Sequence, residues 1–161
     1  MIYLDSTSLK FSLDPKSKKV ELLILDQTLL PHEEKWIKIE KHTQLVEAIK
    51  SLRVRGAPLI GVAACLGLIQ AATTTDKLDR IFQDLYTARP TAVNLMNNLD
   101  EVKSAVIPQL QFEILVEKVV HIFRQDVELC EKMSTHTANL IQDGDSLITH
   151  CNTGGLATAG V

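Results

Sequence analysis

Residues 55–72 read RGAPLIGVAACLGLIQAA, and the rest of the chain can be understood by working outward from them. From Ala57 to Ala72 the sequence is the most apolar of the chain and rich in Ala and Gly, which favours a closely packed helix. The run is shorter than the roughly 20 apolar residues that a membrane span needs, and it contains Gln70. Pro58 suits a first helical turn, because its missing N–H is not used there. The stretch therefore predicts a buried helix over 58–72.

The chain before this helix has the alternating pattern of β-strands. Apolar and polar residues alternate over 9–13 and 35–40, and an apolar run covers 20–25. Turn-forming residues separate the three segments, among them Asp14-Pro15. These segments predict a small antiparallel sheet.

The chain after this helix has a helical period. We expect helices over 43–52, 76–88 and 91–106, capped by Thr43, Asp76 and Thr91 in that order. A longer pattern from 112 to 142 predicts one long helix that Gly144 ends. Together with the sheet, these helices predict an α+β fold containing a helical bundle.

Residues 144–161 have a pattern different from that of the preceding helices. Residues 145–150 read as a short strand, 151–155 as a tight polar turn, and Leu156 onward as the start of a helix. Strand, glycine turn and helix open a parallel α/β unit, and a parallel strand needs a partner strand. We therefore expect two parts: an N-terminal domain over 1–143, and at 144–161 the first strand and turn of a truncated Rossmann-like domain.

Composition excludes several classes of protein. The 161 residues are 45% hydrophobic and carry a net charge of −3, unlike a disordered chain or a typical nucleic-acid binder. The three cysteines are spaced too widely for a zinc knuckle or a CxxC pair, and the histidines show no metal spacing. We expect no metal site, no cofactor and no membrane segment. An odd cysteine count without an export signal indicates reduced thiols in the cytoplasm.

Two arginine-containing turns are candidates for binding an anion. In Arg55-Gly56-Ala57-Pro58, a cation and a glycine stand directly before a helix N-terminus, where free N–H groups favour a phosphate. The same four residues also suit a plain turn between two helices with a solvated arginine. Arg89 precedes a proline-stiffened turn and could add a second guanidinium, or it too could be a surface arginine.

Cys151 is the candidate catalytic residue. It falls at the carboxyl end of the predicted strand, where open α/β sheets place their ligands. A thiolate there could act as a nucleophile or as a base. The alternative is a small buried cysteine, which is the role we expect for Cys65 and Cys130.

Taken together, three segments strongly resemble the family of S-methyl-5-thioribose-1-phosphate isomerases of methionine salvage. The segments are RGAPLIGVAA (55–64), RPTAVNL (89–95) and THCNTGGLATAG (149–160). The resemblance follows the whole chain in order, and it extends to ribose-1,5-bisphosphate isomerases and to regulatory subunits of the exchange factor for translation initiation factor 2. It departs at Gly155, where the usual motif has alanine.

The resemblance implies an aldose–ketose isomerase acting on a sugar 1-phosphate. It assigns substrate binding to Arg55, Gly56, Ala57 and Arg89, and it makes Cys151 the thiol that assists hydrogen transfer between two carbons. It also implies a homodimer and a second domain that carries a catalytic Asp. We therefore expect the 161-residue chain alone to be inactive. The open alternatives are a ribose-1,5-bisphosphate isomerase and a non-catalytic interaction module like the translation-factor subunits.

Overall fold

The computed structural model describes residues 1–75, 77–107 and 110–160. The described residues form one antiparallel sheet with strand order β1-β2-β3-β4. The strands are β1 (Ile2–Asp5), β2 (Leu9–Asp14), β3 (Lys19–Leu25) and β4 (Trp36–Ile39). The prediction of three strands is confirmed by β2, β3 and β4, whose ends differ by a residue from those expected, and β1 is an additional strand.

One face of the sheet is apolar and buried. Phe11 lies opposite Leu22 in the register of β2 with β3, and Leu22 in turn lies opposite Ile39 of β4. All three side chains are almost fully buried. Because side chains of a strand alternate between faces, this register places every second residue against the helices.

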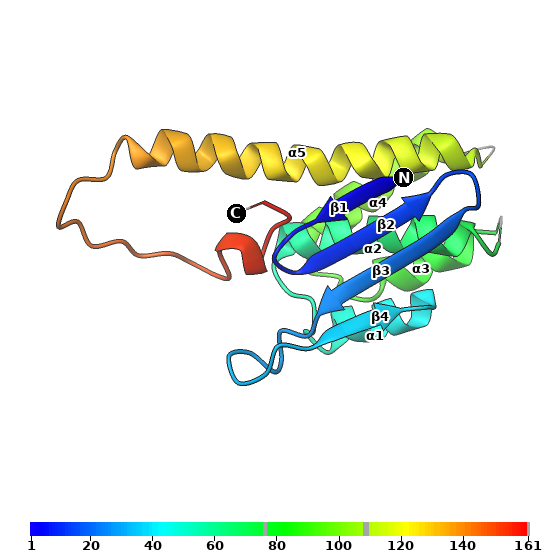
Figure 1. Ribbon diagram of the computed structural model, residues 1–161, viewed down its shortest axis with the longest axis horizontal. Helices are drawn as coiled ribbons and strands as arrows, with labels where there is room; N and C mark the ends of the chain where they lie inside the picture. The colour runs from blue at the N-terminus through cyan, green and yellow to red at the C-terminus, as the bar shows by residue number, and fades with distance from the viewer. Residues whose placement is uncertain (76, 108–109, 161) are drawn as a thin grey trace.

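Five α-helices follow the sheet in the described part of the chain. They are α1 (His42–Lys50), α2 (Ala57–Ala72), α3 (Asp79–Tyr86), α4 (Val93–Val106) and α5 (Phe112–Ala138). Figure 1 shows α2, α3 and α4 behind the sheet and α5 running along the side of β1. Helix α2 is buried almost throughout from Leu59 to Ala72 and packs against α4, α5 and α1. The predicted central helix and α+β class are confirmed.

The N-terminus of α1 differs from the prediction. The helix begins at His42, so Thr43 is already inside it and does not cap it. The Gln44 side chain caps the helix start instead, because its Oε1 accepts the N–H of Glu40 at 2.8 Å and the N–H of Lys41 at 3.0 Å. Gln44, the third residue of α1, thus accepts backbone N–H groups of the two residues that precede the helix.

The other helix starts are partly as predicted. Pro58 lies in the first turn of α2, as expected. The expected cap at Thr91 is wrong, since α4 begins at Val93 and has no side-chain cap. Asp76 lies outside the described residues, and α3 begins at Asp79.

Helix α5 is shorter than predicted and leaves the body of the protein. It ends at Ala138 rather than near Gln142, and Gly144 lies in the exposed coil that follows. Every residue from Glu131 to Gly154 is exposed. Figure 1 shows the end of α5 and this coil extending beyond the sheet. The helical pattern continues past Cys130, but packing no longer supports it there.

The predicted strand over 145–150 and the predicted helix after Leu156 are both wrong for this structure. Residues 145–150 form an exposed coil, and the only regular element after it in the described residues is a short 3₁₀ turn, η1 (Gly154–Leu156). A β-strand is defined by hydrogen bonds to a neighbour, and no described strand lies beside this segment. Residues 145–150 therefore do not form a strand here.

Removing a large side chain from the middle of α2 should destabilise the whole fold. Leu66 is fully buried, so Leu66→Ala is expected to lower the free energy of unfolding by about 2–5 kcal/mol through lost burial and a cavity. Urea unfolding followed by circular dichroism measures this change. The matched control is Leu129→Ala on the exposed side of α5, where the residue is 51% exposed and the change should stay within about 0.5 kcal/mol. Equal losses in both variants would contradict the central role of α2.

Candidate active site

The Arg55-Gly56 turn leads directly into α2. Gly56 is the residue before the helix and has φ +103°, a conformation that side chains rarely allow. A Cβ added at Gly56 would lie 2.4 Å from the Cα of Ala157. Only glycine therefore permits the close approach between the start of α2 and the end of the described chain.

The N–H groups at the start of α2 are less available than the sequence predicts. Pro58 has no N–H, and the N–H of Leu59 donates to the Ala157 carbonyl at 3.1 Å. The N–H of Ile60 already makes an intrahelical bond to Gly56. Of these residues, exposed Ala57 is the one whose N–H the helix end offers to an anion.

Residues 154–160, here called the docked segment, return from the exposed coil and pack on the N-terminal body (Figure 1). Within it, Ala157 and Ala159 are buried. Gln27 Nε2 donates to the Leu156 carbonyl at 2.7 Å, and Ser8 Oγ donates to the Gly155 carbonyl at 3.4 Å. Both Gln27 and Ser8 are themselves buried polar residues. The docked segment is thus held by hydrogen bonds from the sheet side of the body.

Gly155 is tightly enclosed, which bears on its departure from the family motif. A Cβ at this residue would lie 2.5 Å from Thr7 Oγ1. Glycine is therefore the residue that fits this approach without a shift of Thr7.

A second anchor comes from α5. The Asp126 carboxylate accepts the N–H of Ala159, with 2.6 Å between Oδ2 and the nitrogen. Burial raises the pKa of Asp126, and hydrogen bonds from the backbone of Ala159 and Gly160 partly offset that rise. A carboxylate in this setting is a strong acceptor for backbone N–H groups.

The structure places Cys151 in an exposed turn just before the docked segment. Its φ is +60°, a left-handed conformation uncommon for a residue with a side chain. Its thiol is free and exposed, whereas Cys65 and Cys130 are buried as predicted. Burial raises the pKa of Cys65, with a smaller contribution from Glu101, so this thiol is held in its neutral form.

The two arginines lie in loops that precede packed helices. Arg55 Nε is buried without a hydrogen-bond acceptor among the described residues. Arg89 is half-buried in the turn before α4, where its carbonyl accepts the N–H of Ala92 at 3.0 Å. The N-terminal parts of the two helices meet, because a Cβ at Gly61 of α2 would lie 2.9 Å from the carbonyl oxygen of Asn94 of α4.

The structure therefore brings only part of the predicted set together. The start of α2 and the docked segment are in direct contact, and the Arg89 loop precedes a helix whose first turn packs on α2. No hydrogen bond within the described residues joins Cys151 to either arginine.

Sequence reasoning missed the anchors Gln27 and Asp126. Gln27 follows a strand and gives no local signal of its partner, which is 129 residues away. Asp126 did give a signal, because it lies between Phe123 and Cys130 on the inward side of α5. A carboxylate within an apolar stripe requires donors, and here they come from the docked segment.

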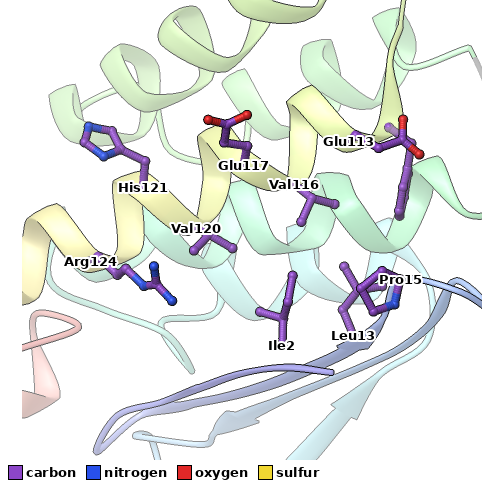
Figure 2. Close-up of a pocket in the computed structure, with 10 residues that line it drawn as sticks. Ile2, Leu13, Pro15, Glu113, Val116, Glu117, Val120, His121 and Arg124 are labelled. Atoms are coloured by element: carbon purple, nitrogen blue, oxygen red, sulfur yellow. The ribbon is translucent and has the colours of Figure 1, made fainter.

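A separate cavity lies beside the first half of α5. It measures about 550 Å³. Val116 and Val120 of α5 face Ile2 and Leu13 of the sheet across it (Figure 2). None of the predicted site residues lines this cavity, so it is distinct from the contact between α2 and the docked segment.

Among residues 1–75, 77–107 and 110–160, no group of three or more His, Cys, Asp or Glu side chains is placed to hold a metal ion. In the same residues, no helix combines the length and the apolar character needed to cross a membrane.

Comparison with known proteins supplies relatives along nearly the whole chain. The methylthioribose-1-phosphate isomerase of Klebsiella pneumoniae (strain 342) is 43% identical over 161 residues, and that of Serratia proteamaculans is 46% identical over 143 residues. These alignments cover 98% and 87% of this chain but 45% and 42% of the relatives. The chain thus spans less than half the length of the curated relatives it matches.

Solved structures share the fold. The crystal structure of 5-methylthioribose 1-phosphate isomerase from Pyrococcus horikoshii OT3 matches 98% of this chain and 46% of its own, with a TM-score of 0.82 and 32% identity. The translation initiation factor eIF-2B subunit delta from A. fulgidus matches 93% of this chain and 46% of its own, with a TM-score of 0.72 and 31% identity. Residues 53–159, which include the Arg55 turn, the Arg89 loop and most of the docked segment, match the initiation factor 2 subunit family, and the chain belongs to that family.

Proposed function

We propose that the protein is an aldose–ketose isomerase that converts S-methyl-5-thioribose 1-phosphate to S-methyl-5-thioribulose 1-phosphate. The observation that carries the proposal is the hydrogen bond from Leu59 to Ala157, which joins the Arg55-Gly56-Ala57 turn to the segment that follows Cys151. The isomerases of Klebsiella pneumoniae and Pyrococcus horikoshii support it through their similarity along this chain. This assignment places the protein in methionine salvage.

In this proposal the two arginine loops bind the sugar phosphate. Arg55 has a buried Nε without an acceptor, which a phosphate oxygen would satisfy. Exposed Ala57 offers its N–H to the substrate at the helix N-terminus. Gly56, which the resemblance also assigns to substrate binding, lets the docked segment pack beside this N-terminus. Arg89 supplies a second guanidinium from the loop before α4.

Cys151 would then serve the hydrogen transfer. The substrate carries its phosphate on the anomeric oxygen, so its ring must open without a free aldehyde form as the starting point. One hydrogen then moves from C2 to C1 as the aldose becomes the ketose. We assign assistance of this transfer to the exposed Cys151 thiol.

The wider organisation of the protein is part of the same proposal. We expect a boundary near residue 143, a homodimer, and a location in the cytoplasm, consistent with three free cysteines. The resemblance assigns the catalytic Asp to a second domain that these residues do not match. Residues 1–161 alone are therefore expected not to turn over substrate.

A second candidate is a non-catalytic interaction module. The structural match to the eIF-2B delta subunit of A. fulgidus favours it. The decisive experiment uses the protein expressed from its complete reading frame, offered methylthioribose 1-phosphate or ribose 1,5-bisphosphate. Turnover of the first sugar supports the proposal, and turnover of only the second assigns the protein to the bisphosphate isomerases. The absence of both activities favours the interaction module.

The arginine of the first loop should act through substrate binding. Arg55→Ala is expected to raise KM by about 10–100-fold, because a charged hydrogen bond contributes roughly 1.5–3 kcal/mol. Steady-state kinetics of the complete protein measure this change. The matched control is Arg80→Ala on the exposed side of α3, which should leave KM unchanged. An unaltered KM in Arg55→Ala would remove this residue from the phosphate site.

A further inference from the structure

Asp126 is the residue of α5 whose side chain forms a hydrogen bond with the docked segment, beside the packing of Cys130 near Gly160. Its Oδ2 lies 2.6 Å from the Ala159 nitrogen. No ion pair with Asp126 is formed by the lysines, arginines and histidines of the described residues. The carboxylate is thus used for backbone N–H groups and not for a neighbouring cation.

The other hydrogen bonds to the docked segment come from other parts of the body. Gln27 donates to the Leu156 carbonyl, Ser8 to the Gly155 carbonyl, and Leu59 of α2 to the Ala157 carbonyl. These three anchors are donors that bind carbonyl groups, whereas Asp126 is an acceptor that binds N–H groups. The carbonyl contacts therefore do not replace the contact that Asp126 makes.

The location of Cys151 depends on these anchors. On its N-terminal side, every residue back to Glu131 is exposed and makes no buried contact. On its C-terminal side, burial of the chain begins within the docked segment. The body of the protein therefore fixes Cys151 chiefly from the C-terminal side.

We propose that Asp126 is a positioning residue of the proposed active site, which fixes the docked segment on α2 and thereby places the turn that carries Cys151. The inference rests on the proposed function for its catalytic meaning. Asp126 itself touches the backbone of the docked segment and not the substrate. Its loss should consequently affect the chemical step more than the binding of the phosphate.

The test compares Asp126→Ala with Asp126→Asn and Glu131→Ala in the protein expressed from its complete reading frame. Glu131 is an exposed acidic residue of the same helix and serves as the matched control. Hydrogen exchange of residues 155–160 reports docking, and steady-state kinetics with methylthioribose 1-phosphate separate kcat from KM. Circular dichroism confirms that each variant is folded.

In Asp126→Ala, exchange of residues 155–160 should accelerate by about tenfold or more, and kcat should fall by about tenfold or more. KM should change by less than about threefold, because Arg55 and Arg89 remain. Asp126→Asn should recover part of both losses, because its amide oxygen still accepts the N–H of Ala159. Glu131→Ala should match the wild type in all measurements.

Each outcome decides the inference. Unchanged exchange and unchanged kcat in folded Asp126→Ala overturn it, and so does an Asn variant as impaired as the Ala variant. A fall in kcat that appears equally in Glu131→Ala also overturns it. If the wild-type protein does not isomerise the sugar, the proposed function fails and the catalytic role of Asp126 fails with it. Wild-type turnover with a fully active Asp126→Ala overturns the role of Asp126 alone.

Discussion

Cys151→Ser in the protein expressed from its complete reading frame is expected to lower kcat for methylthioribose 1-phosphate by about 10²–10⁴-fold, the usual contribution of a positioned acid or base. The hydroxyl of serine is a far weaker acid than a thiol, so it cannot replace the thiol in hydrogen transfer. The substitution leaves the fold intact, because the Cys151 side chain is exposed and its sulfur bonds to no other cysteine.

Two measurements separate this prediction from a loss of structure. The urea midpoint of Cys151→Ser should remain that of the wild type, since surface substitutions change stability by about 0.5 kcal/mol or less. Ser146→Ala, in the same exposed coil, is the matched control and should keep full activity. A Cys151→Ser protein that retains more than about a tenth of kcat would exclude the thiol from the reaction.

Gly56→Ala should disturb both the fold and the site. The new side chain would occupy a residue with φ +103°, at a cost of about 1–3 kcal/mol of stability. Its Cβ would also overlap the Cα of Ala157 at 2.4 Å. Because a backbone atom cannot rotate away as a side chain can, the docked segment has to move. We expect kcat/KM to fall by about 10²-fold, as for a catalytic group displaced by roughly 1 Å.

A second glycine separates the strain from the overlap. Gly144 has φ +90°, but a Cβ there would meet nothing within 4 Å. Gly144→Ala should therefore lose some stability while keeping its activity and the slow exchange of residues 155–160. Hydrogen exchange and kinetics on both variants make the comparison. The same kinetic loss in both would show that close packing at Gly56 does not matter.

The parts of the fold that the sequence predicts well are those set by local patterns. The alternation over 9–13 predicts a strand with one buried face, and the apolar run of 57–72 predicts a buried helix. The structure has both, as β2 and α2. β1 was missed because four residues carry too little alternation, and its pairing of Leu4 with Phe11 requires β2. The strand expected over 145–150 is wrong for a different reason, since no described strand lies beside it to pair with.

The same distinction applies to the site. The Arg55 turn could be identified as a candidate because cation, glycine and proline stand together in the sequence, and its role in binding stays a prediction. Gln27 and Asp126 could not be assigned a role in this way, because their partners lie far along the chain. The expectation of free N–H groups at the start of α2 was also too simple, since the N–H of Leu59 donates a hydrogen bond to the Ala157 carbonyl. The docked segment is held by contacts between residues that are far apart in the sequence.

The exposed residues 139–153 connect the end of α5 to the docked segment, so the segment binds the body as a tethered ligand does. A tether of this kind keeps the segment at an effective concentration in the millimolar range, so four hydrogen bonds and two buried alanines can suffice to hold it. Doubling the tether would weaken docking by only about 0.6 kcal/mol. Insertions in the coil of this stretch should therefore be tolerated during evolution, whereas the spacing from Gly154 to Gly160 is constrained.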